Sequence, residues 1–189
     1  MNYILIDTAY IDRVTFDLIV NFERMIGRRI PPADLPQWLD CVALDGGLRP
    51  GDNKITVLFV HPKEDAALRY FIPSHFGDEL DGKAFNDKIG EFEMKCLPVE
   101  EVTTTADMMT QCLKTLVETG DADNVMLVGD METYGEELKK TAAECSEKVK
   151  GDLTVFAMEP MNVRHCESEI LGYSIMAALG IGAEEINKK

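Results

Sequence analysis

The stretch Val125-Met126-Leu127-Val128-Gly129-Asp130 decides how this chain is expected to fold, because an apolar run ends there in a glycine and an acid. A short apolar run without interruption is typical of a β-strand that is covered on both faces. Tyr3-Ile4-Leu5-Ile6-Asp7 has the same design, and Ile55-Thr56-Val57-Leu58-Phe59-Val60 is a longer run of β-branched and apolar residues. We therefore expect buried parallel strands, two of which place an acid at the carboxyl edge of one sheet.

Segments with helical periodicity lie between these runs. Apolar residues recur at intervals of three and four, which indicates one buried helix face in each segment. The expected helices cover residues 11–25, 33–44, 107–118 and 133–149, with a short helix at 64–71 and a C-terminal helix at about 167–179. The expected strands cover residues 3–6, 55–60, 91–97, 125–128 and 153–158. This alternation predicts an α/β fold, a Rossmann-like three-layer sandwich with a mainly parallel central sheet.

The composition is that of one globular domain. Hydrophobic residues make up 46% and charged residues 28% of the 189 residues, and no linker divides residues 1–189. No run approaches the roughly 18 uncharged apolar residues of a membrane span, so we expect a cytoplasmic protein without membrane association. The five cysteines are widely spaced, without a C-x-x-C pair, and are interpreted as reduced thiols. Residues 73–86 are polar and contain glycine, which indicates a flap or an irregular loop.

The net charge of −15 disfavours nonspecific binding of nucleic acid, because the average field of the molecule repels phosphates. Only a local basic patch would reverse this. Arg24, Arg28 and Arg29 form one candidate patch, and Lys139 with Lys140 forms another.

Three acids follow segments that are expected to be extended. Asp7 and Asp130 end apolar runs, and Asp107 follows Thr103-Thr104-Thr105. If these segments are parallel strands, the three carboxylates meet at one edge of the sheet. Hard cations such as Mg²⁺ or Mn²⁺ prefer carboxylate oxygens and keep exchangeable waters, so the pattern predicts a divalent-metal site. A local role is the alternative, since an acid between a strand and a helix commonly caps the helix.

The same residues resemble a known family. Ile4-Leu5-Ile6-Asp7, Thr105-Ala106-Asp107-Met108-Met109 and the segment from Asp123 to Glu132 occur in the order and approximate spacing of NYN domains, which are PIN-like metal-dependent ribonucleases. The resemblance implies that Asp7, Asp107 and Asp130 bind Mg²⁺ or Mn²⁺. It also implies that Glu132 acts with them as a catalytic residue, either binding the metal through water or orienting that water.

The chain departs from the NYN pattern at several positions. Val128 stands where the family usually has serine, Glu132 stands in place of a second aspartate, and no lysine precedes Asp107. Two functions follow as expectations. The retained acids favour a metal-dependent endoribonuclease that hydrolyses phosphodiester bonds in RNA. The substitutions and the charge of −15 favour a catalytically degenerate PIN-like scaffold that binds a protein partner or a second copy of itself.

Overall fold

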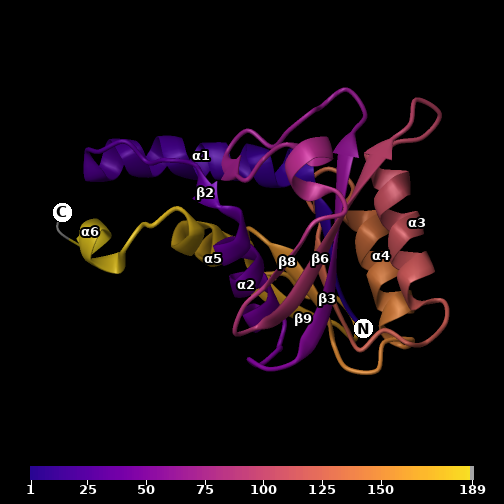
Figure 1. The fold of residues 1–189 in the computed structure, drawn as a ribbon. Helices are drawn as coiled ribbons and strands as arrows, with labels where there is room; N and C mark the ends of the chain where they lie inside the picture. The colour runs from indigo at the N-terminus through magenta and orange to yellow at the C-terminus, as the bar shows by residue number, and fades with distance from the viewer. Residues whose placement is uncertain (188–189) are drawn as a thin grey trace.

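The computed structural model describes residues 1–187 and contains a central sheet of seven strands between two layers of helices (Figure 1). The strand order is β5-β6-β3-β1-β7-β8-β9, and every neighbouring pair is parallel except β5 with β6. The strands are β1 (Asn2–Asp7), β3 (Asn53–Pro62), β5 (Ala84–Asn86), β6 (Gly90–Val99), β7 (Asn124–Val128), β8 (Leu153–Ala157) and β9 (Glu167–Ile170). The mainly parallel α/β fold expected from the sequence is confirmed.

The six parallel strands are wound in two directions from β1. The chain passes from β1 to β3 and β6 on one side, then crosses to β7, β8 and β9 on the other. The carboxyl ends of β1 and β7 therefore lie at the point where the strand order reverses. In open α/β sheets this point is the usual place for a binding crevice.

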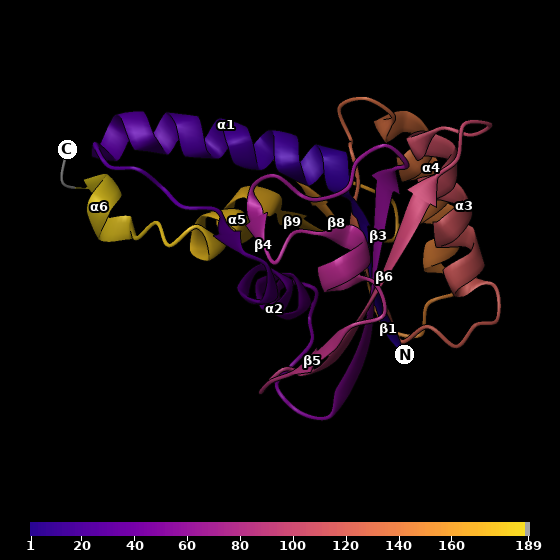
Figure 2. The same ribbon diagram turned by 45° about the horizontal axis from the view of Figure 1, so that its top comes forward.

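Alternate residues of β1 enter two separate cores, as the two-residue period of a strand requires. Ile4 and Ile6 belong to one core, which also contains buried residues of α1 (Thr8–Ile26), α2 (Leu35–Asp45) and α5 (Leu171–Ala178). Leu5 belongs to the other core, under α3 (Thr105–Val117) and α4 (Gly135–Ser146). The two helix layers on opposite sides of the sheet are visible in Figure 2.

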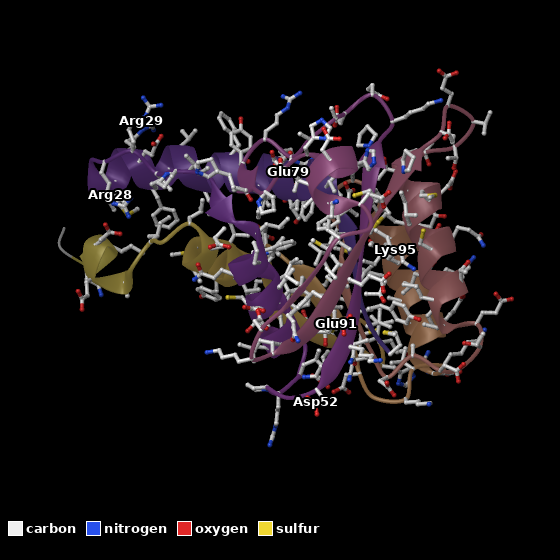
Figure 3. All side chains as sticks on the ribbon, in the orientation of Figure 1. Arg28, Arg29, Asp52, Glu79, Glu91 and Lys95 are labelled. Atoms are coloured by element: carbon white, nitrogen blue, oxygen red, sulfur yellow. The ribbon has the colours of Figure 1, made fainter. Side chains whose placement is uncertain are left out.

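Helix α1 begins at the carboxyl end of β1 and extends well beyond the sheet (Figures 1 and 2). Its far end lies beside the short helix α6 (Ala183–Asn187). Arg28 joins the two, because its Nε and Nη2 donate to the Glu185 carboxylate at 2.7 and 2.9 Å. Figure 3 shows the Arg28 side chain between the two helices. Among residues 1–187, no helix is both long and apolar enough to cross a membrane.

Two sequence predictions were wrong in the segment between β3 and β6. Residues 64–71 do not form a helix, because other parts of the chain take up their backbone groups. The N–H groups of Arg69 and Tyr70 donate to the Asp12 carboxylate, and the N–H of Leu68 donates to the Ser74 carbonyl. The segment ends in β4 (Phe71–Ile72), which pairs with β2 (Ala33–Asp34) in a small separate sheet.

Residues 73–86 are more ordered than a flap or an irregular loop. They contain η1 (Phe76–Leu80), a single π-helical turn, and the edge strand β5. The C-terminal helix also starts later than residue 167. Residues 167–170 form β9 beside β8, and only the remainder is helical, as α5. Pairing with β8 outweighs the helical propensity of two glutamates here.

Candidate functional site

Asp7 and Asp130 lie at the point of the sheet where the strand order reverses. Asp7 is the last residue of β1, and Asp130 follows the end of β7 by two residues. Both are buried, with 3% and 5% of their surfaces exposed. The expectation that parallel strands bring these two acids to one edge agrees with their positions in the fold.

Both carboxylate oxygens of Asp7 accept a hydrogen bond. The N–H of Tyr10 donates to Oδ1 at 3.2 Å, so Asp7 caps α1 as the local interpretation predicted. The Tyr134 hydroxyl donates to Oδ2 at 2.6 Å. Burial raises the pKa of Asp7, the hydrogen bonds from Tyr134 and Tyr10 lower it in part, and the charge of Asp130 raises it further. The net pKa lies above the usual value for an aspartate.

Asp130 is held in its charged form. Its Oδ1 accepts from the N–H groups of Glu132 and Thr133 at 3.2 and 3.1 Å, and its Oδ2 accepts from Arg13 Nη1 at 3.2 Å. Burial acts to raise the pKa of Asp130, but the hydrogen bonds from Arg13 and Thr133 outweigh it. The pKa of Asp130 therefore lies below its usual value.

Arg13 connects Asp130 with the fourth predicted residue. Its Nη2 donates to Glu132 at 3.3 Å while Nη1 contacts Asp130 at 3.2 Å, so one guanidinium bridges both acids and offsets part of their charge. The Arg13 Cζ atom also lies 5.3 Å from the centre of the Tyr10 ring. Glu132 is exposed, and Arg13 is about half exposed, so this pair faces solvent.

Asp107 has a different environment. It lies in the first turn of α3, where its side chain is exposed. Thr104 caps this helix, because the N–H of Asp107 donates to Thr104 Oγ1 at 3.1 Å. Asp107 is therefore neither the cap of α3 nor the end of a strand, since β6 ends at Val99.

Within residues 1–187, no group of three or more histidine, cysteine, aspartate or glutamate side chains is arranged to hold a metal ion. The donors at Asp7 and Asp130 are Tyr10, Tyr134, Glu132, Thr133 and Arg13. Of these, Arg13 and Tyr134 are functional candidates that reasoning from the sequence missed. Their only signal is proximity in sequence, since Arg13 follows Asp7 by six residues and Tyr134 follows Asp130 by four.

Comparisons with known proteins identify the family. No curated protein and no solved structure matches the chain. The model of one family, described as "Family of unknown function (DUF6621)", matches residues 1–186. Membership of the NYN family stays a prediction. The chain belongs to the DUF6621 family.

Proposed function

We propose that this protein is a catalytically degenerate PIN-like scaffold that acts as a protein-interaction module. The observation that carries the proposal is the position of Arg13, whose guanidinium contacts both Asp130 and Glu132. A fixed positive charge at these two acids supplies what a bound cation would supply in a metal-dependent nuclease. It also repels a cation that approaches the same oxygens.

The other acids support the same conclusion. A divalent cation at Asp7 would compete with the Tyr134 hydroxyl for Oδ2, and Mg²⁺ additionally requires near-octahedral geometry with several waters. Asp107 projects from α3 into solvent. The net charge of −15 further disfavours an RNA substrate. An interaction module needs none of these groups to react, and its charge favours partners of opposite sign.

The metal-dependent ribonuclease is the rival function, and one observation favours it. The charge of Asp130 contributes to raising the pKa of Asp7, so the two buried carboxyl groups interact at the usual binding point of the fold. In that mechanism Mg²⁺ or Mn²⁺ would activate a water for attack on a phosphodiester. Arg13 would then have to leave Asp130 before the metal binds.

Calorimetric titration with MnCl₂ separates the two functions. We expect no binding heat from the wild-type protein at millimolar Mn²⁺, and no cleavage of labelled single-stranded or structured RNA. The variant Arg13→Ala removes the competing charge. Arg49→Ala is the matched control, because it removes an exposed arginine that pairs with neither Asp130 nor Glu132. Gain of Mn²⁺ binding in Arg13→Ala alone would identify Arg13 as the group that occupies the site.

The opposite result is equally clear. Mn²⁺ binding by the wild type that disappears in Asp7→Asn/Asp130→Asn, together with RNA cleavage, would establish the nuclease and refute the scaffold.

A further inference from the structure

Strand β9 leaves one edge of the central sheet open. It pairs in parallel with β8 on one side, and within residues 1–187 no strand pairs with its other side. The backbone N–H and C=O groups along such an edge are free to pair with another chain. The opposite edge of the sheet is formed by β5, which is antiparallel to its neighbour.

The side chains of β9 alternate in exposure. Glu167 and Glu169 are exposed, whereas Ser168 and Ile170 are partly buried. A third acid, Asp45 at the end of α2, lies near enough to Glu169 for their charges to interact. Burial raises the pKa of Asp45, and the charge of Glu169 raises it further.

These three acids have no compensating partner in the described part of the chain. Neither Glu167, Glu169 nor Asp45 forms an ion pair there. The edge therefore combines unpaired backbone groups with an uncompensated negative charge. A strand added to this edge would place its alternate side chains opposite the two glutamates.

The charges at the β9 edge indicate which kind of chain can pair with it. Two copies of β9 that paired with each other would bring glutamates face to face, and like charges in that position are destabilising. Two molecules of net charge −15 also repel each other at a distance. A second copy of this chain is thus disfavoured, and an extended basic segment is favoured.

We propose that the free edge of β9 binds an extended segment of a partner protein with lysine or arginine at alternate positions, which adds to the sheet as an eighth strand. Backbone hydrogen bonds would supply affinity, and the basic side chains opposite Glu167 and Glu169 would supply specificity. This inference rests on the proposed interaction function and names the surface and the class of partner.

The test uses a capped six-residue peptide of alternating lysine and valine, titrated into the full-length protein in calorimetry and ¹⁵N NMR. We expect chemical-shift changes centred on residues 167–170. The variant Glu167→Lys/Glu169→Lys should weaken binding by about tenfold or more, since two attractive charges become repulsive.

The matched control is Glu91→Lys/Glu93→Lys on β6. These glutamates are also exposed and alternate along a strand, and Figure 3 shows Glu91 on β6. Both edges of β6 are already occupied at these positions, by β3 and β5. We expect this variant to bind the peptide within about twofold of the wild type at moderate salt, where distant charges are screened.

A second peptide separates strand addition from simple charge attraction. N-methylation at alternate residues keeps every charge but removes half of the backbone donors, and we expect it to weaken binding by about tenfold or more. Hydrogen exchange of the wild-type β9 amides should slow when the unmodified peptide is added, a readout that does not depend on how well any variant folds.

Equal weakening by the β9 and β6 variants, equal binding of the two peptides, or unchanged exchange at β9 would overturn the edge proposal. None of these results would change the outcome of the Mn²⁺ titration or of the RNA cleavage assay. Failure of this inference is therefore distinguishable from failure of the proposed function.

Discussion

Asp40 on α2 lies beside Asp87, a residue of the turn before β6. Burial is the main cause that raises the pKa of Asp40, and the hydrogen bond and charge of Asp87 raise it further, to about 7. The charge of Lys88 lowers this pKa and that of Asp34 raises it. Within residues 1–187, Asp40 Oδ1 is buried without a donor, which is consistent with a carboxyl group that is protonated in part of the population.

This pair makes stability depend on pH. The pKa of Asp40 in the folded protein lies above the unfolded value of 3.8, so its contribution to stability is complete below about pH 4 and is lost as the pH rises through about 7. Asp40→Asn keeps a neutral side chain at every pH. We expect the free energy of unfolding of Asp40→Asn, relative to that of wild type, to rise by about 1 to 2 kcal/mol between pH 5 and pH 8. This is less than the full pKa shift implies, because Asp40 is partly exposed.

Urea unfolding at the two pH values measures this difference. Asp52→Asn, at an exposed turn residue, serves as the control. A stability difference between Asp40→Asn and wild type that is the same at pH 5 and pH 8 would contradict a raised pKa of Asp40.

The site shows what single residues in the sequence can and cannot predict. Asp7 and Asp130 could be placed at one edge because each follows an apolar run, and parallel strands end together. Arg13 could not be found in this way, because its reach to Asp130 depends on the direction in which α1 leaves the sheet. The prediction that Asp107 follows a strand was wrong, because the threonines before it were interpreted as extended, whereas Thr105 already begins α3.

At the scale of elements, the start of β6 depends on a glycine that no other residue can replace without strain. Gly90 has a φ of 151°, and a Cβ atom added there would lie 2.3 Å from the carbonyl oxygen of Asn53 on the neighbouring strand β3. The side chain of Asn53 in turn donates to the Ile89 carbonyl at 2.7 Å. Asn53 on β3 is thus in close contact both with Gly90 and with the residue before it.

Gly90→Ala should therefore destabilise the protein by about 2 to 4 kcal/mol, from backbone strain together with a clash against main-chain atoms that cannot move aside. Chemical denaturation gives the change in the free energy of unfolding. Gly182→Ala is the matched control, because a Cβ there meets no atom within 4 Å. Similar free energies of unfolding for the two variants would mean that β3 and β6 can move apart at Gly90 with little loss of stability.

The elements that the sequence predicted well are those whose own residues determine them. β1, β3, β7 and β8 are apolar runs buried on both faces, and α1 has a clear apolar stripe. β9 was predicted as helix because its four residues are held by pairing with β8 and carry no strand pattern of their own. The prediction of a helix at 64–71 was wrong for a similar reason, because the Asp12 side chain on α1 accepts hydrogen bonds from two backbone N–H groups of this segment.

At the scale of the whole molecule, the excess of acids opposes folding. With 34 aspartates and glutamates against 19 lysines and arginines, the compact state concentrates negative charge that the unfolded chain spreads out. Salt screens this repulsion, with a Debye length that falls from about 30 Å at 0.01 M to about 8 Å at 0.15 M. Neutral salt should therefore stabilise this protein.

We expect the melting temperature to rise by about 2 to 4 °C between 10 and 150 mM NaCl, if screening relieves about 1 kcal/mol of repulsion in a chain of this size. Differential scanning calorimetry measures the change. The control variant Glu101→Gln/Asp121→Asn/Glu144→Gln removes three exposed acids and should respond less. A melting temperature that falls with salt would indicate that ion pairs such as Arg13 with Asp130 outweigh the general repulsion.

The same acids should produce the opposite salt response in binding. Salt that stabilises the fold weakens attraction between β9 and a basic strand, because screening acts on attraction and repulsion alike. Raising NaCl over one range should thus increase the melting temperature and reduce the affinity for the lysine–valine peptide. A melting temperature that rises while the affinity falls would show that the peptide is recognised by its charge. A loss of affinity caused by a less stable protein would instead accompany a falling melting temperature.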